Sequence, residues 1–298
     1  MNSNPPIDLA VLEERIYSAL EDIGSEEFLS LLARLGGEMP SYLKAHLELE
    51  HSLPSPSGLT SCRTQLYWKG KKAEEDEGKR IPAHWFSRSA AGVMKEPFWF
   101  AVLERAGIDL TITKDPKPCG PHMRAHPDAY IGDSGLLELK DLTAWTFKHL
   151  IEGQGIAYEE PRYYTQCQMY MEATGRDWTL FFASTPDPAF AQSIFRREKK
   201  YGQQWTIPLA YMEIVYRRQQ DVDAGLMRAE MIVRDAAADF PPPREFDGKL
   251  KWPCSYCGYQ ARCNEMFSTN YFVTIAEPEE ELTRRELVAA LDGVDVHP

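Results

Sequence analysis

The stretch from His126 to Lys140, HPDAYIGDSGLLELK, constrains the fold of this chain more than any other segment. Two apolar runs flank GDSG, whose residues favour tight turns, so the stretch predicts an antiparallel hairpin. Side chains alternate between the two faces of a strand, so Glu138 and Lys140 share one face and the leucines beside them share the other. Asp128 lies on the preceding strand, and the ladder brings it within reach of Glu138.

The two acids are residue types that bind a hard metal ion, and the lysine beside them can assist its chemistry. Carboxylate oxygens are ligands that Mg²⁺ and Mn²⁺ prefer, and a divalent cation removes the repulsion between two converging carboxylates. A neighbouring lysine can position or deprotonate a water molecule while the metal stabilises charge that develops on a phosphate. The group therefore predicts hydrolysis of phosphodiesters. Glu-x-Lys also occurs on ordinary solvent-facing strands, so the segments that follow decide between the two interpretations.

The composition is typical of a globular protein. Of the 298 residues 43% are hydrophobic, and no apolar run reaches the roughly 20 residues that a membrane helix needs. The first residues, MNSNPPIDLAVLEER, have neither the basic region nor the apolar region of a secretory signal. We therefore expect a cytoplasmic protein that does not bind membranes.

The net charge of -12 is concentrated at the two ends. Residues 1–50 carry 10 acids and 3 bases, residues 275–298 carry 7 acids and 2 bases, and the rest of the chain carries 28 of each. A nucleic acid needs Lys and Arg to neutralise its phosphates, so the balanced middle permits this partner, with basic stretches at 196–200 and 217–218. The acidic ends could dock a protein partner or shield the groove from nonspecific DNA. Nearby aromatic residues could stack on unpaired bases or belong to the core: Phe195, Tyr201 and Trp205.

Hydrophobic periodicity and turn residues predict a mixed α/β order of elements. Helices are expected within residues 1–50 and at 62–70, 87–107, 144–152, 160–175, 208–239 and 277–293, with a kink or a second helix at Pro97. Strands are expected at 109–114, 122–131, 135–141, 178–184 and 193–199. A Pro- and Ser-rich linker at 52–61 suggests a boundary, and its last Ser and Thr are good helix N-caps. The expected divisions are 1–57 as an acidic helical appendage, 58–270 as the main domain and 271–298 as an acidic C-terminal helix.

Three motifs in this order resemble the PD-(D/E)XK nuclease superfamily, and within it the RecB-like branch. Pro127-Asp128, followed after nine residues by Glu138-Leu139-Lys140, is similar to its core motif. Gln166 and Tyr170 match the Q-x-x-x-Y helical signature of the branch, and Gly92 to Glu96 matches its G-x-x-x-E helix. The resemblance implies a restriction-endonuclease-like core, which is a central mixed sheet flanked by helices.

The resemblance also implies roles for these residues. Lys140 would assist the attacking water, and Gln166 and Tyr170 would orient the lysine and contact the nucleic-acid backbone. His126, two residues before Asp128 and expected on the same strand face, is a spare metal ligand. The implied ligands of Mg²⁺ or Mn²⁺ are Asp128, Glu138, Glu96 and the backbone carbonyl of Leu139.

The cysteines indicate a second site. Cys254, Cys257 and Cys263 form a C-x2-C-x5-C cluster in a loop-rich segment, where three thiolates indicate a metal, and Cys62 is the best candidate for a fourth ligand. One distant cysteine before the nuclease core and three after it resemble the iron-sulfur RecB-like nucleases, the AddB nuclease domain and the CRISPR-associated adaptation nucleases. The match covers roughly residues 58–265. Four thiolates are the usual ligands of a [4Fe-4S] cluster, which would staple the two ends of the domain together.

Zinc is the alternative, because the spacing alone fits a tetrahedral four-ligand site equally well. In that interpretation Cys119 and His122 could be ligands instead. If they are not, Cys119 and Cys167 are expected to be buried free thiols.

The sequence thus predicts a metal-dependent DNA nuclease of bacterial or phage origin. An exonuclease that serves recombination, repair or end processing is the expected form, with DNA that has free ends or single-stranded character as the substrate. The alternative is a non-catalytic nucleic-acid-binding or scaffold module of a recombination complex.

Overall fold

The computed structural model describes residues 6–37, 54–75, 83–112, 115–185, 210–246, 254 and 257–268. Four expectations fall outside these residues: the strand at 193–199, the helix at 277–293, the basic stretch at 196–200 and the three aromatic residues beside it.

The centre of the fold is a five-stranded sheet with the order β1-β4-β5-β6-β7. Neighbouring strands run antiparallel except β5 and β6, which are parallel. The sheet is therefore mixed, as predicted. Its strands are β1 (Leu110–Ile112), β4 (Ala129–Ile131), β5 (Gly135–Asp141), β6 (Trp178–Ser184) and β7 (Tyr211–Tyr216).

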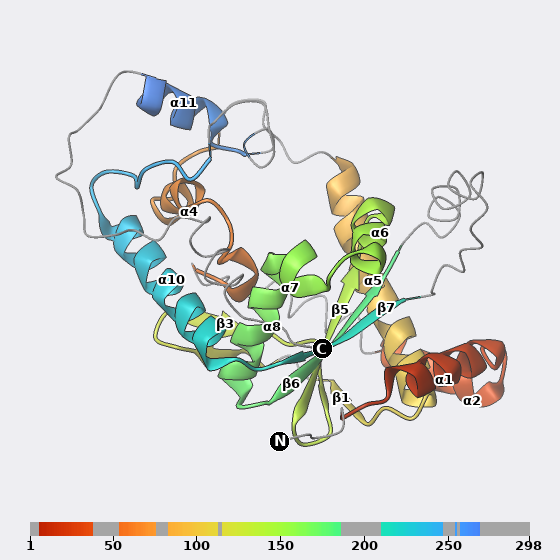
Figure 1. Ribbon diagram of the computed structural model, residues 1–298. Helices are drawn as coiled ribbons and strands as arrows, with labels where there is room; N and C mark the ends of the chain where they lie inside the picture. The colour runs from red at the N-terminus through yellow and green to blue at the C-terminus, as the bar shows by residue number, and fades with distance from the viewer. Residues whose placement is uncertain are drawn as a thin grey trace.

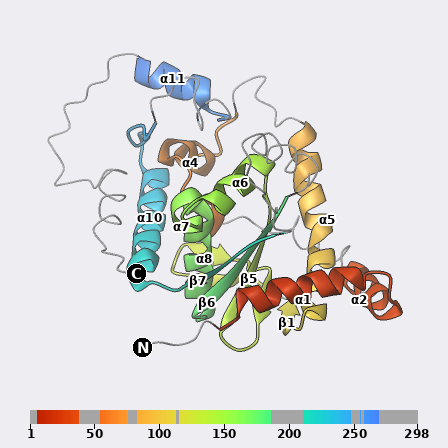
Figure 2. The same ribbon diagram turned by 45° about the vertical axis from the view of Figure 1, so that its right-hand side comes forward.

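Helices cover both faces of this sheet (Figures 1 and 2). On one face α1 (Leu9–Glu21), α2 (Glu26–Gly37) and α5 (Ala83–Arg105) share an apolar cluster with Leu137 of β5. On the other face α6 (Ala144–Glu152), α8 (Pro161–Thr174) and α10 (Gln219–Ala237) share a second cluster with Leu136. All seven residues of β6 are buried, which explains its unbroken apolar sequence WTLFFAS. The predicted mixed α/β fold, with a sheet between helices, is confirmed.

The helical N-terminus also follows the predicted pattern. Leu12 and Ile16 are buried on one stripe of α1, and the Asp8 side chain caps the helix by accepting hydrogen bonds from two backbone N–H groups. Because both N-terminal helices pack on α5, they contribute to the apolar cluster that covers one face of the sheet.

Two expected elements were wrong in detail. The helix expected at 208–239 is a strand followed by a helix in its described part, because residues 211–216 pair with β6 and only α10 is helical. The strand expected at 122–131 is broken. β3 (Met123–Ala125) pairs with β2 (Lys117–Cys119) in a separate two-stranded sheet, and Pro127, which has no N–H to donate, lies in the gap before β4.

Two helices differ from their expected ends. α4 (Arg63–Gly70) has Cys62 as its N-cap residue, without a side-chain capping bond, so neither the Ser nor the Thr before it caps the helix. α5 is one helix from Ala83 to Arg105 with Pro97 inside it, so no second helix begins there. The other described elements are η1 (Pro56–Gly58), α7 (Ile156–Glu159) and α11 (Gln260–Ser268). None of the described helices has both the length and the apolar character needed to cross a lipid bilayer.

Gly135 at the start of β5 provides a test of the packing. A Cβ atom at this position would lie 2.3 Å from Cζ2 of Trp178, whose indole N–H donates to Ser134. We expect Gly135→Ala to lower the free energy of unfolding by about 1–3 kcal/mol, because the indole or the strand must move. Urea unfolding measures this. Gly24→Ala is the control, since its Cβ would meet nothing within 4 Å, and equal losses in the two variants would contradict the prediction.

Candidate active site and cysteine site

The β4–β5 hairpin brings Asp128, Glu138 and Lys140 to one side of the sheet. Ala129 lies opposite Leu137 in the ladder, so Asp128 lies opposite Glu138 one step further along. Ala129 and Leu137 both belong to the cluster on the α5 face. Because faces alternate along a strand, the acids and the lysine point to the α8 face. The predicted arrangement of these three side chains is therefore present.

Direct contacts hold this group in place. Oδ2 of Asp128 accepts a hydrogen bond from the backbone N–H of Leu139 at 2.7 Å, which extends the ladder one step beyond the end of β4. Nζ of Lys140 forms an ion pair with Oε1 of Glu138, whose side chain is only 1% exposed. A buried carboxylate needs such a partner, because an uncompensated charge in the interior is costly.

The pKa of Lys140 lies above its ordinary value. Burial by itself would lower this pKa, but the negative charges of Glu138 and Asp128 outweigh the burial and raise it. The lysine is therefore a cation in this arrangement. It can donate hydrogen bonds to a water or a phosphate, and its charge balances one of the carboxylates.

Glu96 reaches the same group from α5. Its helix lies against the end of β5, where Nζ of Lys95 is 3.1 Å from Oδ2 of Asp141. Burial and the charge of Asp128 raise the pKa of Glu96 to about 9, with a further contribution from Glu138 and an opposing one from Lys140. The predicted third acid is thus within electrostatic reach of the other two. The group holds more carboxyl groups than cations, and a bound cation would favour the charged form of Glu96.

Gln166 and Tyr170 cover the site from α8. Both are buried, and Nε2 of Gln166 donates to the Tyr170 hydroxyl at 2.7 Å. Burial raises the pKa of Tyr170, and the charge of Glu138 raises it further, so the phenol lies close to the acids. The expected convergence of the helix signature on the strand motif is therefore present.

Tyr163 is a site residue that the sequence analysis did not single out. It precedes Gln166 by three positions and Tyr170 by seven, so all three lie on one face of α8. Its ring centroid is 5.5 Å from Nζ of Lys140 and 4.4 Å from Cζ of Arg162, which stabilises both cations. Helical spacing from the Q-x-x-x-Y pair could have identified it.

His126 does not lie on a strand, contrary to the prediction. It lies in the connection between β3 and β4, outside either strand, so it does not share a strand face with Asp128. The strand alternation on which that expectation depended ends at Ala125, the last residue of β3.

The four predicted cysteines influence one another's charge. Burial raises the pKa of Cys257, and the charges of Cys62, Cys263 and Cys254 raise it further against an opposing backbone hydrogen bond from Tyr259. Burial also raises the pKa of Cys263, which Cys62 and Cys254 influence in the same direction while Arg244 opposes them. The thiols therefore lie within electrostatic reach of one another. Four thiols are the donor set of an iron-sulfur or zinc site, so the residues fit either group by their chemistry.

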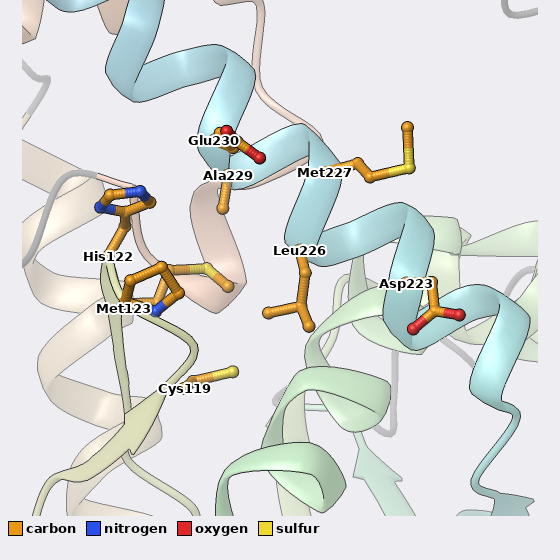
Figure 3. A pocket seen from close by; sticks show the side chains of 9 residues that line it. Cys119, His122, Met123, Asp223, Leu226, Met227, Ala229 and Glu230 are labelled. Atoms are coloured by element: carbon orange, nitrogen blue, oxygen red, sulfur yellow. The ribbon is translucent and has the colours of Figure 1, made fainter.

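The other two cysteines are buried free thiols, as predicted. Sγ of Cys119 donates to the backbone carbonyl of Met169 at 3.3 Å, and burial raises its pKa to about 12. Cys119 and His122 line a cavity of about 330 Å³ between the β2–β3 hairpin and α10 (Figure 3), and its walls contain none of the four clustered cysteines. The alternative in which this pair supplies ligands to that cluster therefore has no support here.

Neither site has the ligand geometry of a bound ion. Among the described residues, no group of three or more His, Cys, Asp or Glu side chains is arranged so that it could hold a metal. The donors converge, and their contacts are with other protein groups, as in the Lys140–Glu138 pair.

Comparisons with known proteins do not identify the function of this chain, so the function must be argued from the site. No family model matches the chain, and no curated protein matches it. The solved structure of an alkaline exonuclease, LHK-Exo from Laribacter hongkongensis, has 16% identity and a TM-score of 0.43 over 61% of this chain and 86% of that one. Its complex with dAMP has 17% identity and a TM-score of 0.44 over 71% and 92%. A structure of SSO0001 has 14% identity and a TM-score of 0.44 over 78% and 94%.

The shifted pKa of Glu96 predicts a pH dependence of stability. The unfolded value is 4.5 and the folded value about 9, so the folded protein holds an extra proton between them and loses stability as the pH rises through this range. Glu96→Gln is always neutral and should lack this loss. In urea unfolding between pH 5 and 9 without divalent ions, the free energy of unfolding of the variant should rise relative to that of the unmutated protein as the pH increases. Glu14→Gln, at an exposed position of α1, is the control. Parallel profiles for Glu96→Gln and the unmutated protein would rule out the shift.

Proposed function

We propose that this protein is a metal-dependent nuclease that hydrolyses phosphodiester bonds in DNA. The observation that carries the proposal is the convergence of Asp128, Glu138, Glu96 and Lys140 at the end of β5, beneath Gln166 and Tyr170 of α8. Acidic oxygens with surplus negative charge attract a hard divalent cation, and a cation bound there can in turn hold a phosphate.

Mg²⁺ or Mn²⁺ would be held by Asp128, Glu138, Glu96 and the carbonyl of Leu139, where it would stabilise negative charge that develops on the phosphate. The protein groups have separate tasks. The two strand acids and Glu96 supply oxygen ligands, which favour these ions over zinc. Lys140, as a protonated donor, orients the attacking water or a phosphate oxygen. Gln166, Tyr170 and Tyr163 of α8 position the lysine and form one wall of the site.

We propose more specifically that the protein acts as an exonuclease and serves recombination, repair or end processing. These follow from the resemblance of the motifs to RecB-like nucleases. Substrates with and without ends distinguish the two modes of cleavage, because an exonuclease leaves a covalently closed circle intact while it degrades the same DNA after linearisation.

Variants of the acid group test the activity. We expect Asp128→Ala, Glu138→Gln and Lys140→Met each to reduce Mn²⁺-dependent degradation of labelled linear DNA by about 100-fold or more, because each removes stabilisation of the transition state. The measurement is the rate of nucleotide release, with and without EDTA. Asp133→Asn in the exposed turn of the hairpin should retain full activity. If Asp128→Ala and the unmutated protein act equally slowly, a non-catalytic scaffold module replaces this proposal.

For the four cysteines we propose a [4Fe-4S] cluster that staples residue 62 to residues 254–263. The proposal rests on the electrostatic proximity of the four thiols and on the resemblance to iron-sulfur nucleases. A zinc ion bound by the same thiols is the alternative. The staple would join the two ends of a domain that spans residues 58–270.

The cofactor can be read from its colour and metal content. Protein purified without oxygen should be brown, with broad visible absorption, and should contain iron and sulfide. Cys254→Ala should bleach the protein, whereas Cys119→Ala, the control at a buried thiol outside the group, should not. Colourless protein that contains about one zinc ion per chain would establish the zinc alternative.

A further inference from the structure

The two segments that carry the clustered cysteines lie far apart in the sequence and side by side in space. Cys62 immediately precedes α4, and Cys263 lies in α11. Both helices lie at the same end of the molecule as the last turns of α10 (Figures 1 and 2). Contacts that need no metal hold this arrangement, and two adjacent residues after α10, Arg244 and Glu245, are central to them.

Glu245 holds the segment around Cys62. Oε2 of Glu245 accepts a hydrogen bond from the backbone N–H of Arg63 at 2.8 Å. Its two oxygens also accept from Arg228 at 2.6 and 3.0 Å, and Arg228 donates to the carbonyl of Ser61 at 3.2 Å. The backbone is therefore fixed on both sides of Cys62.

A buried ion pair reinforces this contact. Nε and Nη2 of Arg63 donate to the two oxygens of Asp235 at 2.7 and 3.0 Å, and both residues are less than 10% exposed. Bidentate pairing fixes the orientation of the guanidinium group as well as its position. The start of α4 is thereby fastened to the C-terminal part of α10.

Arg244 reaches in the opposite direction, to the segment that carries Cys263. Its Nη2 donates to the backbone carbonyl of Cys263 at 2.5 Å and to Oδ1 of Asn264 at 2.8 Å. Its guanidinium group also lies 5.0 Å from the ring centroid of Phe267. Adjacent residues thus bind the two cysteine-bearing segments separately.

We propose that Arg244 and Glu245 form a strap that positions these two segments, so that the four thiols are gathered before any metal group binds. The inference builds on the proposed four-thiol site but does not depend on nuclease activity or on whether iron or zinc occupies the site. Because the strap uses charged side chains and backbone groups, it persists when the thiols carry no metal. Arg244 and Glu245 are therefore positioning residues for the site and not its ligands.

Cross-linking of the metal-free protein tests the strap. In a Cys254→Ser, Cys257→Ser background, reduced and treated with chelator, dibromobimane should join Cys62 to Cys263 rapidly. Arg244→Ala or Glu245→Ala should slow this reaction about tenfold or more, because the thiols then meet only through the flexible chain. The matched controls are Arg234→Ala and Glu230→Ala, which remove the same charges from exposed positions of α10. They should react at the unaltered rate.

A second readout uses Co²⁺ as a probe in the chain with all four cysteines. The strap variants should bind Co²⁺ about 10- to 100-fold more weakly, as is usual when groups that orient ligands are removed, while the two α10 controls should bind it normally. Far-UV circular dichroism checks that each variant is folded. Where an alanine variant is not folded, Arg244→Lys and Glu245→Gln take its place.

Three results would overturn the proposal. If folded strap variants cross-link and bind Co²⁺ as the controls do, the strap has no positioning role. If the unmutated metal-free protein does not cross-link, the thiols are not gathered in advance. Equal losses in strap and control variants would point to a general effect of charge. Failure of DNA degradation would leave these measurements unaffected, so the two proposals fail separately.

Discussion

The register between β4 and β5 is the constraint on which the proposed site depends. A slip of one residue would turn Glu138 and Lys140 to the α5 face and Leu137 and Leu139 to the α8 face. The apolar clusters on both faces oppose this slip, and so does the Asp128 carboxylate, which continues the ladder by accepting from the Leu139 N–H at 2.7 Å. One side chain therefore both fixes the register and contributes an acid to the site.

The same arrangement gathers charges that a folded interior normally excludes. Glu138 is almost completely buried, and its ion pair with Lys140 compensates for the loss of water. Glu96 brings a third acid to this group, and its own burial, followed by the charge of Asp128, raises its pKa. Buried ionisable side chains with shifted pKa values are typical of binding and catalytic sites, because a purely structural core excludes such groups.

Much of this could be predicted from the sequence, because local patterns encode it. The hairpin follows from alternation around the GDSG turn, α8 from its helical spacing up to Gly175, and β6 from an unbroken apolar run. β7 was missed although residues 211–216, YMEIVY, contain the strand-forming residues Tyr, Ile and Val. The helix predicted at 208–239 was extended back over them, whereas they pair with β6. Tertiary context decides such segments.

In the candidate site, too, some residues could be found from local patterns and others only from the structure. The acids, the lysine and the Gln166–Tyr170 pair could be found because motif spacing places them on shared faces. Helical spacing places Tyr163 on the same face as the Gln166–Tyr170 pair, but only the structure shows that its ring contacts Lys140. His126 was misplaced because the strand expected to carry it stops at Ala125.

The parallel pairing of β5 with β6 has a consequence for synthesis of the chain. Parallel neighbours require a long crossover, and here residues 142–177 form it and carry α8 to the site. Until the ribosome has released this crossover and β6, the acids of the hairpin have neither their covering helix nor the strand that buries them. The candidate site is therefore complete only after residues 178–184 have left the ribosome.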